Sequence, residues 1–291
     1  MNKIPVGQTI RFAYAFTFGE IGTVLGLTWI PTLASTIVGY FAARSYLAMA
    51  DSLQSGTPPP DAQALLPLPL AVLSLFLAAM IGVALVRQVL GLRKGPAIAH
   101  FALGMEELRV FAGFVGVYLA LILFLFALAA VVAGFAALGG ATPLAAGITA
   151  FAVFAGFLLV IYALVRLGYL LVPAAVADGH FGLSQSWQLT GGNFWRIVAV
   201  LLATLLPLMV VLVIGEAIIM GPAPAPASAP PADVAGLLRA WTDQMHTMQP
   251  HLPALMGLNL VLAPLGYSLL FAPAAFVYRV LSGKAIVAPH D

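Results

Sequence analysis

Six long apolar segments, separated by short polar stretches, restrict this chain to a membrane fold. Each segment has about the 20 residues that a helix needs to cross the hydrocarbon core of a bilayer. None alternates with the period of two that a membrane β-barrel requires. We therefore predict an all-α integral membrane protein, a single transmembrane domain over residues 1–291, with spans at about 21–43, 66–86, 110–135, 144–165, 197–219 and 252–278.

The composition supports this class and excludes several others. Hydrophobic residues make up 62% of the chain and charged residues 8%, whereas a soluble domain has about 25% charged residues. The net charge of +2 and the lack of a basic tract argue against a nucleic-acid partner. The chain has no cysteine, which excludes disulfides and thiolate metal sites. Membrane lipids are the first partner to infer, and no cofactor is predicted.

Lysine and arginine set the expected orientation, because positively charged loops stay on the cytoplasmic side. With six spans, ten of these residues share the side of the N-terminus, and only Arg44 and Arg239 lie on the other. Both termini are therefore expected in the cytoplasm. The first outer loop, 44–64, is polar and rich in proline, and we expect an exposed turn there. The fourth span can extend as far as Val176, because 167–176 remains apolar.

Shorter stretches between the spans predict further helices. Moderately amphipathic stretches at 5–18, 96–109 and 183–195 precede the first, third and fifth spans. They predict three hairpins, each introduced by a cytoplasmic interfacial helix. An outer amphipathic helix is predicted at 233–248, after a proline-rich spacer. It lies in the membrane interface in our preferred interpretation and docks on a partner protein in the alternative.

Polar residues within the spans are the candidates for function, because a charge in hydrocarbon is costly. Glu20 begins the first span and Arg166 lies near the inner end of the fourth, so the two could form a buried ion pair. Glu216 lies near the outer end of the fifth span and could meet Asn259 of the sixth at a similar depth. Each pair is interpreted either as a structural contact between helices or as part of a substrate or proton path.

The most informative segment runs from Arg166 to Arg196. Arg166 and Pro173 follow the predicted fourth span, and the stretch that leads into the fifth contains Ser186, Trp187, Thr190, Gly192, Phe194, Trp195 and Arg196. Aromatic side chains here can anchor at the headgroup level, and the glycines permit a sharp turn between helices. In the simplest interpretation, the segment only shapes the fold.

This segment resembles the signature of the six-span membrane domain attached to some bacterial glycerophosphodiester phosphodiesterases, and of its stand-alone relatives of unassigned function. The resemblance covers about thirty residues here and otherwise concerns the number and layout of spans. It implies a multi-pass protein of the bacterial inner membrane. The phosphodiesterases carry their catalytic residues on a soluble barrel domain, for which we expect no counterpart in this chain.

Catalytic motifs are not found in the sequence. The five histidines are scattered over loops and never pair at helical spacing. We therefore expect a non-enzymatic inner-membrane protein that organises or assists other membrane components, in envelope or lipid homeostasis. Lipids and another membrane protein are its expected partners. The alternative is a transporter or channel for a lipid or small apolar solute, motivated by prolines within the spans and by the repeated hairpins.

Overall fold

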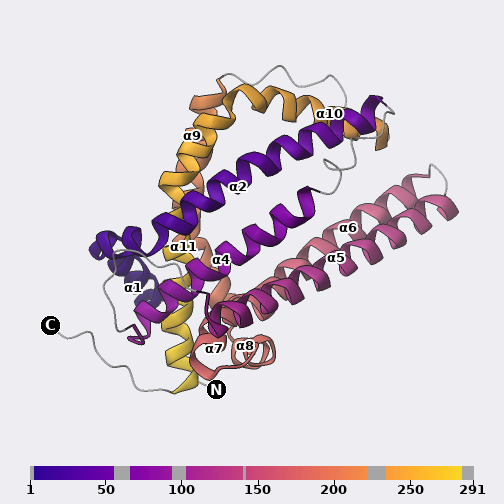
Figure 1. The fold of residues 1–291 in the computed structure, drawn as a ribbon. Helices are drawn as coiled ribbons and strands as arrows, with labels where there is room; N and C mark the ends of the chain where they lie inside the picture. The colour runs from indigo at the N-terminus through magenta and orange to yellow at the C-terminus, as the bar shows by residue number, and fades with distance from the viewer. Residues whose placement is uncertain (1–2, 56–65, 94–102, 140–141, 222–233, 284–291) are drawn as a thin grey trace.

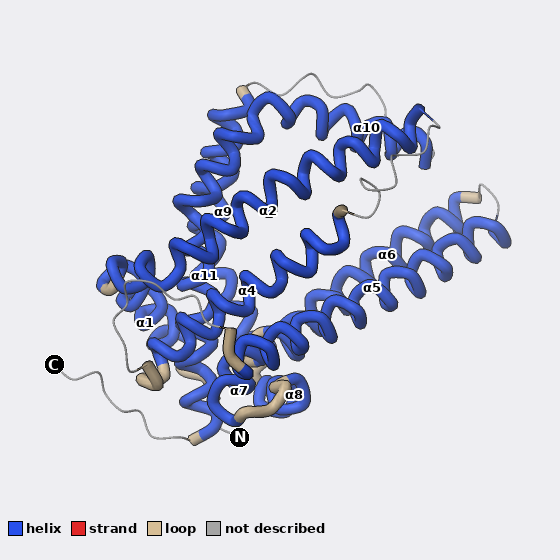
Figure 2. Tube along the Cα trace, viewed as in Figure 1, coloured by secondary structure: helices blue, strands red, loops and turns tan. Residues whose placement is uncertain are grey.

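The computed structural model of the chain describes residues 3–55, 66–93, 103–139, 142–221 and 234–283. These residues are almost entirely helical, and none of them forms a strand (Figure 2). Six candidate spans are long and apolar enough to cross a membrane. The chain is therefore an all-α, multi-pass membrane protein, as its apolar segments predict.

The helices follow the predicted segments closely in most places. The long helices are α2 (Ile21–Ser55), α4 (Pro67–Val89), α5 (Met105–Gly139), α6 (Pro143–Ala163), α9 (Phe194–Met220) and α11 (Leu252–Ser282). The shorter ones are α1 (Val6–Gly19), α7 (Leu171–Asp178), α8 (Leu183–Thr190) and α10 (Val234–Met248). Of the predicted interfacial stretches, 96–109 lies partly outside the described residues.

Helix α2 runs further than predicted. The expectation of an exposed turn beginning at Arg44 is wrong, because α2 continues as a helix to Ser55. Residues 44–55 contain neither glycine nor proline, and Arg44 stacks over the ring of Tyr40 one turn earlier. Nothing local therefore stops the helix before the glycine and prolines that follow it. The remainder of the predicted loop, 56–64, lies outside the described residues.

The fourth span changes its winding near its end. Helix α6 passes into a π-helical turn, Leu164–Gly168, and the chain then resumes as α7. Pro173 is the third residue of α7, where its missing N–H costs no helical hydrogen bond. Because the helix breaks before Pro173, no helical hydrogen bond is lost to the missing N–H. The candidate span reaches past Val176, as the apolar run allows.

The apolar core is concentrated at one end of the molecule. Two clusters of buried side chains meet on α7, which is buried from Leu171 to Val176. Helix α1, α8 and the last turns of α11 also lie at this end, which we call the α7 end (Figure 1). From it α2, α4 and the α5–α6 pair spread apart toward the opposite end, the α10 end.

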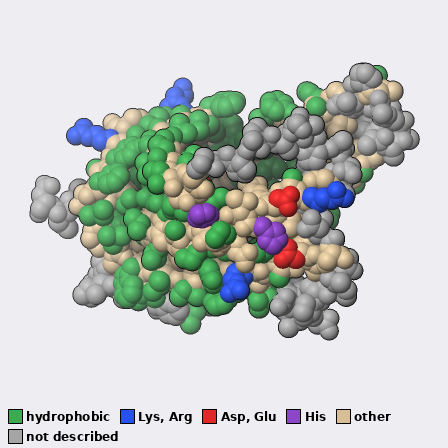
Figure 3. Space-filling model, turned by 90° about the horizontal axis from the view of Figure 1, so that it is seen from above, with side chains coloured by type: hydrophobic (Ala, Val, Ile, Leu, Met, Phe, Trp, Pro, Cys, Tyr) green, Lys and Arg blue, Asp and Glu red, His purple; other side chains and the backbone are tan. Residues whose placement is uncertain are grey.

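Outside this core, most of the long helices expose apolar side chains. On α5 and α6, for example, Phe126 and Phe151 are each 71% exposed. Viewed from the α10 end, the surface shows only a few charged side chains among many apolar ones (Figure 3). Exposure of this kind fits lipid as the solvent, because hydrocarbon tails are as apolar as the side chains that they meet.

Helix α1 packs against α9 and α11. The hydroxyl of Tyr14 donates to the carbonyl oxygen of Ala203 over 2.7 Å, and Thr17 shares a 2.8 Å hydrogen bond with Ser268. Thr17 and Ser268 are fully buried. The first predicted interfacial stretch is therefore a helix tied to two spans, which holds α9 and α11 in a fixed relation at the α7 end.

Candidate functional site

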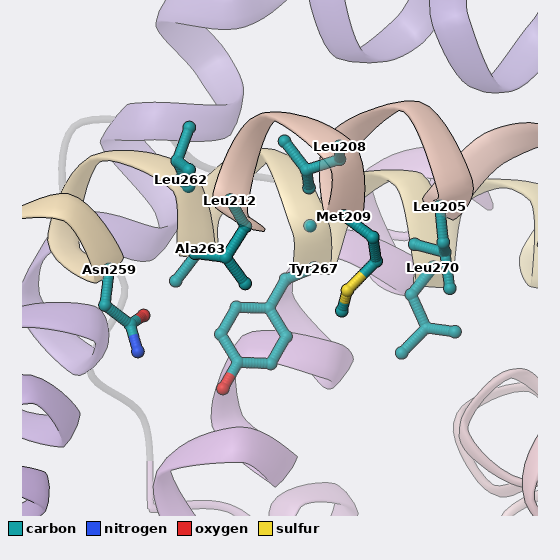
Figure 4. Close-up of a pocket in the computed structure, with 10 residues that line it drawn as sticks. Leu205, Leu208, Met209, Leu212, Asn259, Leu262, Ala263, Tyr267 and Leu270 are labelled. Carbon is teal, nitrogen blue, oxygen red and sulfur yellow. The ribbon is translucent and has the colours of Figure 1, made fainter. Parts of the chain in front are cut away.

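Helices α9 and α11 lie side by side and form a narrow apolar cavity. One face of α9 contributes residues at helical spacing, and α11 contributes the opposite wall (Figure 4). The cavity has a volume of about 270 Å³. Its lining residues are Leu205, Leu208, Met209, Leu212, Asn259, Leu262, Ala263, Gly266, Tyr267 and Leu270.

A second cavity of about 430 Å³ continues from the first toward the α10 end. Four helices surround it, namely α2, α9, α10 and α11. Its lining residues are Gly39, Ala42, Ala43, Tyr46, Leu47, Leu212, Glu216, Trp241, Met245, Met248, Leu252, Leu255, Met256 and Asn259. Leu212 and Asn259 line both cavities, so the two adjoin.

We call these two adjoining cavities the α9–α11 groove. Along α11 the groove extends from Leu252 to Leu270, which is about 27 Å at the usual rise per residue. That length is close to the roughly 30 Å thickness of the hydrocarbon core. The walls are almost entirely apolar, so the groove suits an extended hydrocarbon chain.

Two of the predicted polar candidates meet in this groove. Glu216 and Asn259 both line the cavity near α10, as their similar depth predicts. Neither side chain makes a hydrogen bond or ion pair with another described residue. Glu216 and Asn259 therefore do not form a polar contact between α9 and α11. Both are exposed and accessible to a ligand. A carboxylate and an amide at this depth are costly unless a partner satisfies them.

Helix α10 covers the end of the groove. The predicted helix at 233–248 is present as α10, and its side chains Trp241, Met245 and Met248 line the cavity. The Nε2 atom of His246 lies 2.7 Å from Oδ1 of Asp51, which links α10 to the end of α2. The unpredicted extension of α2 therefore supplies both the wall at Tyr46 and the anchor for α10.

Arg166 lies at the other end of the molecule and does not pair with Glu20. Its guanidinium is 4.2 Å from the ring centre of Trp187, and it donates to the Tyr162 hydroxyl and the Trp187 carbonyl oxygen. Glu20 is exposed, and no ion pair joins it to Arg166 within the described residues. The structure therefore does not form the possible ion pair, and Arg166 contacts Tyr162 and Trp187 instead.

The predicted motif residues gather around the π-helical turn. The Ser186 hydroxyl donates to the carbonyl oxygen of Arg166 and accepts from the amide of Leu170. These are the two backbone groups that an unbroken α-helix would join, so Ser186 is inserted into the helical hydrogen-bond ladder. The Thr190 hydroxyl also approaches the Arg166 carbonyl oxygen, at 3.3 Å. The motif is thus a joint that fastens α8 to the end of the fourth span.

The remaining motif residues continue this joint into α9. The ring of Phe194 packs against Tyr162 and Trp195, while Trp195 is 78% exposed. Gly192 has a positive φ of 71° at the turn between α8 and α9, where the glycines predict one. Arg196 donates to the carbonyl oxygen of Ile4 over 2.8 Å. These contacts explain the motif as a structural element.

Glu216 and Asn259 were predicted from the sequence as candidate polar residues, but the groove that contains them was not. The lining residues of α11 recur every three or four positions, which is a detectable signal. However, α11 is apolar on nearly all sides, so this face does not stand out. No group of three or more metal-ligating side chains occurs in the part of the chain that the structure describes.

In comparisons with known proteins, no family model, curated protein or solved structure matches this chain.

Proposed function

We propose that the protein binds a membrane lipid, or a lipid-like amphiphile, in the α9–α11 groove. One observation carries the proposal: in a continuous, largely apolar groove about 27 Å long, the cavity near α10 contains two exposed polar side chains, Glu216 and Asn259, that have no partner among the described residues. An amphiphile matches this pattern, because its hydrocarbon tail fills the apolar part and its head group meets the polar residues.

In this proposal the protein acts without catalysis in the bacterial inner membrane and assists envelope or lipid homeostasis. Both termini are cytoplasmic, and the short helices at the α7 end lie in the inner interface. The cations Arg11, Arg87, Arg109 and Arg279 support that orientation, because they belong to segments at the α7 end. Helix α10 then lies at the outer surface and covers the groove in the outer leaflet.

The resemblance to the membrane domain of bacterial glycerophosphodiester phosphodiesterases remains part of the proposal. Its motif residues form the joint around Arg166 and Ser186, which lies at the α7 end and away from the groove. A shared joint of this kind would account for the resemblance without a shared activity. The groove then supplies the specific function of this chain.

Lipid transport is a second candidate function, and one observation favours it. Pro207 lies within α9 and Pro264 within α11, each in the stretch that forms the groove. Proline removes a helical hydrogen bond and weakens the helix locally, so both groove helices contain a point at which they can bend. Movement at these points would open the groove and release its ligand.

Filling the groove tests lipid binding directly. Leu212 lines both cavities, so Leu212→Trp places a large ring where the tail would lie. We expect native mass spectrometry of the detergent-purified protein to show one retained lipid on the parent, and at least a tenfold lower bound fraction on this variant. That tenfold change corresponds to about 1.4 kcal/mol of binding free energy.

The matched control is Leu206→Trp. Leu206 is on the same helix, is 56% exposed and does not line the groove, so retention should equal that of the parent. Equal retention by the parent and both variants would show that any bound lipid lies elsewhere. A parent that retains no lipid would also contradict the proposed function.

A further inference from the structure

The wide end of the groove has an electrostatic character that limits its ligand. Among the described residues that line the two cavities, Glu216 is the one that carries a charge, and none is a lysine, arginine or histidine. The aromatic side chains Tyr46 and Trp241 line the same cavity. A cavity lined by a carboxylate and two aromatic side chains favours an ammonium group, because ring faces attract cations.

The neighbouring cationic side chains, Arg44, Arg239, His246 and His251, do not line the cavity. His246 lies against Asp51 on the far part of α2, and Arg44 stacks over Tyr40. No described cation forms an ion pair with Glu216. In the low dielectric of the membrane, a positive ligand group would be strongly favoured at this carboxylate and a negative one disfavoured.

We propose that the groove selects an amphiphile whose head group carries a cationic amine. Glu216 is the counter-ion of the amine, Tyr46 and Trp241 contact it, and Asn259 hydrogen-bonds to the polar linkage between head and tail. An aminophospholipid and a simple long-chain amine share this chemistry. The inference rests on the proposed function, because it specifies the ligand of the same groove.

Competition for the purified protein tests the head-group preference. The parent is incubated with mixed micelles that contain equal amounts of phosphatidylethanolamine and phosphatidylglycerol, and the bound lipids are counted by native mass spectrometry. We expect at least a tenfold preference for phosphatidylethanolamine. N-acetylation of this lipid removes the cation and should abolish the preference. Hexadecylamine should displace the lipid if the amine alone is recognised, and should not if the phosphate linkage is also required.

Glu216→Gln keeps the shape of the side chain and removes its charge. In this variant we expect the preference for the amine lipid to fall at least fivefold, while the total amount of bound lipid stays within twofold of that on the parent. Asp243→Asn is the control, because it removes a carboxylate on α10 that is exposed and does not line the cavity. It should keep the parent's preference.

The outcomes separate the two proposals. If Leu212→Trp lowers lipid retention but Glu216→Gln leaves the preference unchanged, the amine inference is wrong and lipid binding stands. A parent that prefers phosphatidylglycerol, or that binds N-acetylated lipid equally well, also overturns the amine inference. If Leu212→Trp retains as much lipid as the parent, the groove is not the binding site and both proposals fail.

Discussion

Replacing Gly182 with alanine should remove most of the folded protein. Gly182 precedes α8 with a positive φ of 72°, where a side chain costs about 1–2 kcal/mol. A Cβ built there would also lie 2.5 Å from the carbonyl oxygen of Leu171 and 3.1 Å from the amide nitrogen of Ala175. Both atoms belong to the backbone of the buried helix α7, so relief requires moving that helix at a further cost of about 1–3 kcal/mol.

Together these costs are a large part of the roughly 5–15 kcal/mol that stabilises a typical domain. We expect the Gly182→Ala variant to give little monodisperse protein on size exclusion in detergent and a clearly lower melting temperature. Gly192→Ala is the control, since Gly192 has a φ of 71° but no atom within 4 Å of the added Cβ. It should fold with only a modest loss. Equal behaviour of the two variants would contradict the close contact between Gly182 and α7.

Reporter fusions should give an all-or-none result for the orientation. Alkaline phosphatase needs disulfides, which form in the periplasm and not in the cytoplasm. A fusion after residue 230, in the connection between α9 and α10, should therefore be active. A fusion after Asp291 should be inactive, because in the proposed orientation the cations at the α7 end keep that end in the cytoplasm.

A fusion after residue 60 provides a second site on the predicted outer side and should match the fusion after residue 230. We expect at least a tenfold difference in activity between the outer and inner fusions at equal expression. Activity at the C-terminus together with inactivity at both outer sites would reverse the orientation. The groove entrance beneath α10 would then face the inner leaflet.

Local properties of the sequence were enough to predict much of the fold. Apolar length alone identifies the candidate spans, and helical spacing identifies α10. The turn at Gly192 was also predictable, because glycine readily adopts a positive φ. In each case the sequence pattern and the structural element that it predicts lie in the same short segment of the chain.

The missed features depend on contacts between distant segments. The groove joins Tyr46, Glu216 and Trp241 from three helices, and no local pattern brings these together. The possible pair of Glu20 and Arg166 rested on equal depth, but depth does not determine the direction in which a side chain points around its helix. The π-helical turn likewise depends on Ser186, which lies 20 residues beyond the carbonyl group that it binds.

The most direct test of the account is to locate a bound tail in the groove. A phospholipid with a diazirine at mid-chain is loaded onto the protein, and the sample is then moved into nanodiscs with a large excess of unlabelled lipid before irradiation. Lipid at the outer surface exchanges rapidly, whereas a tail held in the groove should remain. Peptide mapping should therefore find label on groove residues such as Leu208, Leu212 and Ala263, and little on Leu206 and Val210, which are exposed and do not line the groove. Equal loss of label from both sets would show that no lipid is held in the groove, and would contradict the central claim.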